Sequence, residues 1–222
     1  MDDRRAPVKC LDDLVAYTRE VGILPFFRNG VPGFSLEEHI APEVWFARGV
    51  DGPWEWKGPA IRAGLVYAKL FGGRAVFITP EWYGELANVR RNGGDFDTMT
   101  DEGMITRGEA RLREAFAGEK TLSSRELRAR AGLSKSAAET AVTRIQMDCL
   151  MLAADFDYDR DAAGRTYGWG VARYALTDVY LGEKFVDAMQ EHTVEASRGM
   201  LLSHLTGLYG EAHMNALRRM IG

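Results

Sequence analysis

The sequence has little that would place it in a membrane or in an oxidising compartment. None of its apolar runs approaches the roughly 20 residues that span a bilayer. The opening residues, MDDRRAPVKCLDD, are too polar for a signal peptide. Only two cysteines are present, Cys10 and Cys149, so neither a disulfide framework nor a cysteine zinc site is available. We therefore expect a cytoplasmic protein with reduced thiols and no membrane partner.

Several motifs of cofactor and metal chemistry are also missing. Neither Gly-Gly pair has the lysine and spacing of a phosphate loop, and there is no Gly-x-Ser-x-Gly elbow. The four histidines include no helical pair with zinc-ligand spacing. Four aspartates alternate in DFDYDRD, but Arg160 occupies the position where an EF-hand loop needs glycine. We predict no cofactor and no metal site, and we interpret DFDYDRD as an exposed acidic turn.

Acidic residues slightly outnumber basic ones overall, but positive charge is concentrated in one segment. The formal net charge is −4. The segment from Arg107 to Arg144, however, contains nine Lys or Arg and five Glu, an excess of about +4. A local excess of this kind favours contact with phosphates, although a solvated helical surface has the same composition.

The segment from Met104 to Tyr180 has the pattern of three helices followed by a two-stranded ribbon. Thr106 with Glu109, and Ser123 with Glu126, stand at the spacing of capping boxes and mark two helix starts. Gly132 is placed to end the second of these helices. This order predicts a winged helix within a mainly α protein with a small β part, that is, an α+β fold.

The third helix of this segment has one apolar stripe and one small, polar face. The stripe consists of Ala138, Ala141, Val142, Ile145 and Cys149. A polar helix face of this kind can enter a major groove, and the ribbon would be the wing. We predict that double-stranded DNA is contacted by Ser134, Lys135, Ser136, Thr140, Thr143 and Arg144 of the helix and by Arg160 and Arg165 of the ribbon. A winged helix used only for packing or for protein contact has the same pattern.

The first half predicts a helix that ends at Gly22 and, at Ser35 and Glu38, a further capping box. Apolar residues from Ile61 to Phe71 suit a helix stopped by Gly72-Gly73. A buried strand should follow over Arg74–Thr79, and Pro80 should open another helix, because proline loses no hydrogen bond at a first helical position.

Trp54, Trp56 and Lys57 precede the predicted helix in the first half. Aromatic rings beside a cation can bind a flipped base or another planar ligand. Tryptophans before a helix also commonly anchor a core. Both interpretations remain open at this point.

Asn92 to Gly103 is rich in Gly and Asp without periodicity, and we interpret it as a linker. The expected parts are an N-terminal helical unit over 1–95, a winged-helix domain over 104–180 and C-terminal helices over 181–222. Gly207 and Gly210 should break those helices, which either pack on the core or form a homodimer seam.

The block WEWKGPAIRAGLVYAKLFGGRAVFITPEWY and the later RAGLSKSAAETAVTRIQMDCLM resemble the AlkZ-related proteins. These are relatives of the AlkZ and YcaQ winged-helix DNA glycosylases. The resemblance extends from about Leu14 to Leu176 and rests on the Trp-x-Trp-Lys block and the helix-rich arrangement. It implies a winged-helix fold and a link to DNA repair or DNA binding.

The glycosylases carry a Gln-x-Gln or Gln-x-Asp motif that handles the catalytic water, as the resemblance implies. The matching letters here are Gln146-Met147-Asp148. In a regular helix, side chains two positions apart point about 200° away from each other, so these two do not converge on one water. We assign no catalytic residue. Our first hypothesis is a DNA-binding protein with a repair-linked role and without assigned glycosylase activity. The alternative is a non-enzymatic transcription regulator with a small-molecule pocket near the Trp-rich block.

Overall fold

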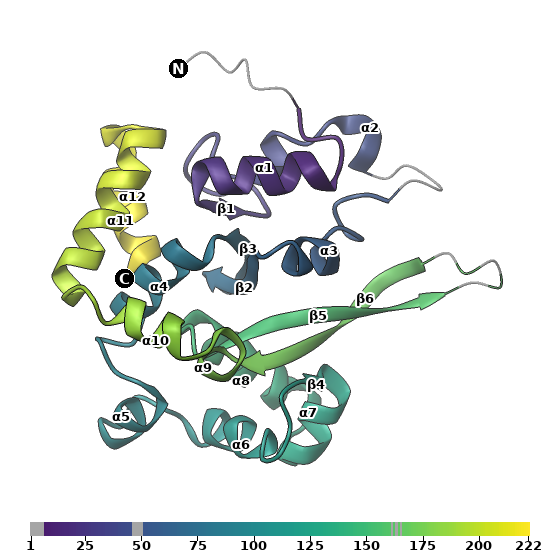
Figure 1. Ribbon diagram of the computed structural model, residues 1–222, viewed down its shortest axis with the longest axis vertical. Coiled ribbons are helices and arrows are strands. Elements are labelled where there is room, and N and C mark those ends of the chain that lie inside the picture. Colours follow the sequence, from purple (N-terminus) through teal and green to yellow (C-terminus); the bar gives the residue numbers. More distant parts are fainter. Residues whose placement is uncertain (1–6, 46–50, 161, 163, 165) are drawn as a thin grey trace.

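The computed structural model describes residues 7–45, 51–160, 162, 164 and 166–222. Within them, helices surround one antiparallel sheet of six strands in the order β1-β3-β2-β5-β6-β4 (Figure 1). The predicted α+β class is confirmed. One hairpin of the sheet extends well beyond the helices on one side of the molecule.

The first half contributes three strands of this sheet and the helices that cover them. Helix α1 ends at Gly22, where φ is +74°, and α4 begins with Pro80, both as predicted. The elements are α1 (Leu11–Val21), β1 (Ile23–Pro25), η1 (Leu36–Glu38), α2 (Pro42–Trp45), α3 (Lys57–Arg62), β2 (Val66–Phe71), β3 (Arg74–Ile78) and α4 (Pro80–Arg90).

Two predictions about this half are wrong. The helix expected up to Phe71 is α3 followed by strand β2, because Gly72 and Gly73 have φ of +58° and +72° and form a two-residue hairpin turn. Burial in β2 alternates between buried and partly buried positions as far as Leu70, which suits a strand whose two faces are covered to different extents. Ser35 and Glu38 make no capping box; the Ser35 hydroxyl instead donates to the Glu38 carboxylate at 2.6 Å, beside a 3-10 turn.

The middle of the chain has the predicted order of helices and ribbon. The capping boxes at Thr106 and Ser123 are present, and Gly132 is left-handed, with φ +60°. The elements are α5 (Phe96–Asp101), α6 (Arg107–Ala115), β4 (Leu122–Ser123), α7 (Ser124–Ala131), α8 (Lys135–Met147), β5 (Met151–Arg160) and β6 (Thr166–Leu176).

Residues 92–103, which we interpreted as a linker, contain the short helix α5. Asp95 caps this helix by accepting a hydrogen bond from the Thr98 amide. Phe96 and Met99 are buried against α6 and α7, so local capping and two apolar side chains are sufficient to order the segment.

The C-terminal helices cover α4 and the sheet. Leu201, Leu205, Leu217 and Ile221 are buried in the same cluster as β2, β3 and α4. Gly207 does not break α11, which continues to Tyr209 and ends at Gly210, with φ +93°. The elements are α9 (Thr177–Leu181), α10 (Glu183–Met189), α11 (Val194–Tyr209), η2 (Glu211–His213) and α12 (Met214–Ile221). A homodimer through these helices stays a prediction.

The sheet is continuous across the boundary that we predicted between the first two domains. Strand β2 pairs with β5 at Tyr67 and Ala153, and the largest apolar cluster takes side chains from both regions. The division into three domains stays a prediction.

A buried polar junction lies where α4, the end of α8 and the start of α9 meet. The Arg91 side chain has an exposed fraction of 0%; it donates to the Asp178 carboxylate at 2.8 Å and to the Cys149 carbonyl. The Tyr83 hydroxyl donates to the same carbonyl at 3.1 Å and lies 3.2 Å from the Thr177 hydroxyl. Three segments distant in sequence are therefore joined by polar contacts inside the core.

We predict that Arg91→Met lowers the free energy of unfolding by about 3 kcal/mol, because it leaves the Asp178 carboxylate without its cation and removes one of the two hydrogen bonds to the Cys149 carbonyl. Urea unfolding followed by circular dichroism measures this. Arg219→Met, on the exposed side of α12, is the matched control and should change stability by less than about 0.5 kcal/mol. Equal stabilities of the two variants would contradict the assignment.

Candidate functional site

Helix α8 presents its N-terminal half to solvent. Ser134 caps the helix and accepts a hydrogen bond from the Ala137 amide at 3.3 Å. The predicted apolar stripe is buried: Ala141, Val142 and Ile145 lie in one cluster with residues of α5, α6 and α7, whereas Cys149, beyond the end of α8, belongs to the cluster of the sheet and α4. On the outer side, Ser134, Lys135, Ser136 and Thr140 are exposed, as a surface for a partner requires.

The C-terminal half of α8 is engaged by the protein itself. The Thr143 hydroxyl accepts a hydrogen bond from Lys69 Nζ at 3.2 Å. Arg144 Nε lies 3.3 Å from a carboxylate oxygen of Glu109, whose side chain has an exposed fraction of 0%. Sequence reasoning could not reveal either contact, because both partners are remote in sequence.

Gln146 and Asp148 have structural surroundings. The Gln146 side chain is buried; it accepts from the Lys69 amide at 3.1 Å and donates to the Val142 carbonyl at 3.1 Å. Burial is the main cause that raises the pKa of Asp148 above its ordinary value, and the nearby Glu109 carboxylate raises it further. The amide of Gln146 therefore already has partners for its oxygen and its nitrogen.

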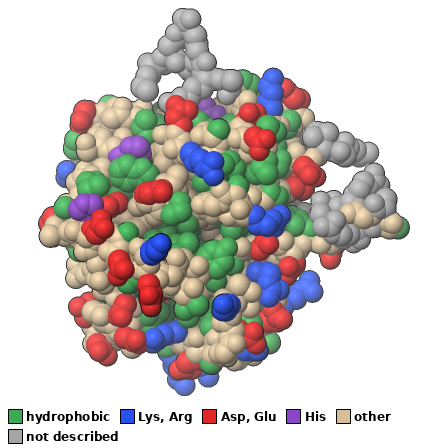
Figure 2. All heavy atoms as spheres, viewed as in Figure 1, with side chains coloured by type: hydrophobic (Ala, Val, Ile, Leu, Met, Phe, Trp, Pro, Cys, Tyr) green, Lys and Arg blue, Asp and Glu red, His purple; other side chains and the backbone are tan. Residues whose placement is uncertain are grey.

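A basic surface continues from α8 over α6 and α7. Figure 2 shows Lys and Arg side chains at the lower margin, where Figure 1 places these helices, with acidic side chains among them. Its exposed cations are Arg107, Arg111, Lys120, Arg125, Arg128, Arg130, Lys135 and Arg144. A cavity of about 530 Å³ lies between α6 and α7, lined in part by Arg111 and Arg130; Arg130 pairs with Glu119 at 2.6 Å.

The acidic residues of the predicted wing are partly neutralised. Asp155 pairs with Arg62 at 2.6 Å, and Asp157 pairs with Arg173 at 3.1 Å. We predicted that two arginines of the wing, Arg160 and Arg165, contact DNA. The side chain of Arg160 and the whole of Arg165 lie outside the described residues.

The structure brings Trp54, Trp56 and Lys57 together at the start of α3. The Trp54 ring stacks on Phe26, with centroids 5.0 Å apart. Trp56 has an exposed fraction of 4%, and its ring nitrogen donates to the Asp51 carbonyl at 3.1 Å. Both tryptophans belong to the apolar cluster beneath α1.

Lys57 is a buried cation beside an aromatic ring. Its exposed fraction is 6%, and Nζ lies 4.3 Å from the centroid of Phe156 on β5. Burial lowers the pKa of Lys57 from 10.5 to about 8, and the Glu55 carboxylate partly opposes this shift.

An open cleft of about 590 Å³ lies between α3 and β5, beside this cluster. Its lining residues are Asp51, Glu55, Pro59, Arg62, Phe156, Asp157 and Tyr158. The Tyr158 hydroxyl donates to the Trp54 carbonyl at 3.0 Å, and burial raises the pKa of Tyr158 to about 12. Gly58 lies close to β5, because a Cβ there would lie 2.7 Å from Asp155 Oδ1 and 3.6 Å from Tyr158 Cε2. The sequence singled out neither Tyr158 nor Gly58.

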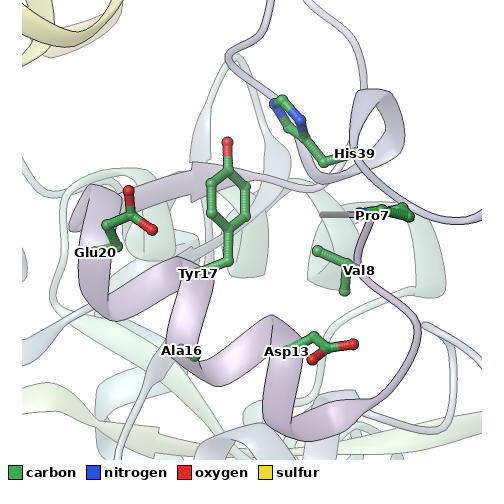
Figure 3. A pocket seen from close by; sticks show the side chains of 7 residues that line it. All are labelled: Pro7, Val8, Asp13, Ala16, Tyr17, Glu20 and His39. Carbon is green, nitrogen blue, oxygen red and sulfur yellow. The ribbon is translucent and has the colours of Figure 1, made fainter. Parts of the chain in front are cut away.

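A second pocket, of about 240 Å³, lies along α1 (Figure 3). The Tyr17 and His39 rings meet edge to face with centroids 4.9 Å apart, and His39 Nε2 lies 2.9 Å from the Gly33 carbonyl. Asp13 and Glu20 flank Tyr17 on the same helix. In Figure 1, α1 and α8 lie in opposite halves of the molecule, so this pocket is remote from the basic surface.

Among the described residues, no group of three His, Cys, Asp or Glu side chains could hold a metal ion. The same residues include no helix that is both long and apolar enough to cross a bilayer.

A family model described as AlkZ related matches residues 8–222. No curated protein matches the chain, and no solved structure does.

We predict that Lys57 makes stability rise with pH. Between about pH 8 and pH 10.5 the unfolded chain holds a proton on this amine that the folded chain has released, so folding becomes more favourable as pH rises. Urea unfolding of the wild type and of Lys57→Met across this range tests this. The stability of the wild type relative to the variant should increase with pH, and a constant difference would contradict the prediction.

Proposed function

We propose, from the premise that this chain belongs to the AlkZ-related family, that it is a winged-helix protein that binds double-stranded DNA. Membership of the family relates the chain to proteins linked with DNA repair. We assign it a repair-linked role on that basis, with α8 as the element that meets the DNA.

The observation that carries the proposal is the exposed N-terminal half of α8. Lys135 lies in its first turn, where free amides and the helix dipole already attract anions. Ser136 and Thr140 follow on the outer side, and small hydroxyl side chains can approach phosphates or base edges closely.

The surrounding elements support the winged-helix interpretation. Helices α6, α7 and α8 are followed by the β5–β6 hairpin, and β4 pairs with β6 at Leu122 and Tyr174. The cations of α6 and α7 extend the positive surface next to α8, and ion pairs at Asp155 and Asp157 reduce the negative field of the wing.

Glycosylase activity requires a group that positions water or stabilises a cationic sugar. Gln146 does not supply it, because its side chain is buried and hydrogen-bonded to the backbone. The competing function is a non-enzymatic transcription regulator, and the cleft of about 590 Å³ beside the Trp-rich block favours it by offering space for a small molecule. Release of free base from alkylated duplex separates the two functions: release supports the repair enzyme, and tight binding without release supports the regulator.

We predict that Lys135→Glu weakens duplex binding about tenfold and lowers the salt dependence of log Kd by about one, because one phosphate contact is lost. Fluorescence anisotropy with a labelled duplex at several salt concentrations measures both. Lys184→Glu, an exposed residue of α10, makes the same charge change elsewhere and is the control. Arg144 is unsuitable for this test, since a carboxylate there would face the buried Glu109.

Absence of duplex binding by the wild type at low salt would overturn the proposed function. Equal affinities of the Lys135 and Lys184 variants would remove α8 from the interface.

A further inference from the structure

We propose that the β2–β3 hairpin is a second DNA-contacting element, with Arg74 and Lys69 placed to meet the phosphate backbone beside α8. The proposal rests on the function proposed above and names a part of the interface outside the winged helix.

The hairpin turn is in direct contact with α8. A Cβ on Gly73 would lie 2.9 Å from Thr143 Cγ2, so only glycine permits this approach without a shift. Lys69 holds the same helix at two points, through its Nζ to the Thr143 hydroxyl and through its amide to the Gln146 side chain. Both glycines of the turn have positive φ, which fixes a tight two-residue connection.

The contact lies at one end of the exposed polar stripe of α8. Ser136, Thr140 and Thr143 follow one another at helical spacings of four and three, so they share one side of the helix. Seven residues of helix span about 10.5 Å, close to the width of the major groove at about 12 Å. The stripe therefore fits within one groove, with Lys135 at one end and the hairpin turn at the other.

The hairpin end of the stripe carries its own positive charge. Arg74 is exposed, and one of its terminal nitrogens donates to the Arg28 carbonyl at 3.1 Å, which brings a second exposed arginine next to it. Glu37 is the nearby acid, and it accepts a hydrogen bond from the Arg28 amide at 2.9 Å. Glu139 is exposed on α8, between the two ends of the stripe.

This arrangement accounts for the position of Thr143. A residue that contacts bases has to be exposed and free of partners within the protein. Thr143 is instead half-buried and accepts a hydrogen bond from Lys69. At the C-terminal end of α8, Lys69 and Arg74 of the hairpin would therefore contact DNA in place of Thr143. Because the hairpin is already packed on α8, no segment has to become ordered before it contacts DNA.

The test is duplex binding by Arg74→Glu, with Arg219→Glu on α12 as a control with the same charge change. Anisotropy titrations from about 50 to about 250 mM salt give affinity and salt dependence. We expect Arg74→Glu to bind about five- to tenfold more weakly, with the salt slope lowered by about one, and Arg219→Glu to stay within about twofold of the wild type. Arg74→Gln should have a smaller effect in the same direction, and thermal unfolding of each variant verifies that it is folded.

The outcomes separate this proposal from the one it rests on. If the wild type binds and Lys135→Glu weakens binding while Arg74→Glu matches Arg219→Glu, the hairpin contact is overturned and the proposed function stands. If the wild type does not bind duplex at low salt, both are overturned. If Lys135→Glu and Arg74→Glu both weaken duplex binding, the result supports a DNA-contacting surface that includes both ends of the stripe.

Discussion

The Cys149 carbonyl is the point on which the arrangement of the molecule depends. It accepts hydrogen bonds from Tyr83 and Arg91 of the α4 segment, and Arg91 also pairs with Asp178 of α9. Arg90, the preceding residue, donates to the Ile221 carbonyl at the end of α12. Uncompensated charge is costly inside a protein, so these partners have to be in place together. The helices around α8 and the terminal helices are thereby held in fixed positions on the sheet.

The same fixed arrangement determines which part of α8 is available to a partner. Its C-terminal half packs on the β2–β3 hairpin and pairs through Arg144 with the buried Glu109, whereas the half that begins at Ser134 is exposed. The candidate interface is therefore composite. The capped N-terminus of α8 supplies one end, and a hairpin from the first half of the chain supplies the other.

Local chemistry could be predicted from the sequence, and long-range contacts could not. The capping boxes at Thr106 and Ser123, the left-handed Gly132 and the apolar stripe of α8 depend on neighbours within a few residues, and the structure has them. Strand β2 was mistaken for helix because periodicity alone does not distinguish a short apolar strand from a segment of buried helix. Lys69 and Glu109, which contact Thr143, Arg144 and the side-chain oxygen of Gln146, lie more than 30 positions away, and no spacing in the sequence indicates them.

The corner at Cys149 also has a geometric consequence for the hairpin that follows. Cys149 has φ of +58°, an uncommon conformation for a residue with a side chain, and β5 begins two residues later at Met151. Side chains along a strand alternate between its faces, so this corner sets which side chains face which side at the start of β5, up to the irregularity in register between Ala153 and Asp155. Met151 packs in the apolar cluster around α6 and α7, and Leu152 packs in the cluster with α4 and the sheet. A chain that turned one residue late would exchange these two sides, so that each side chain would face the other cluster.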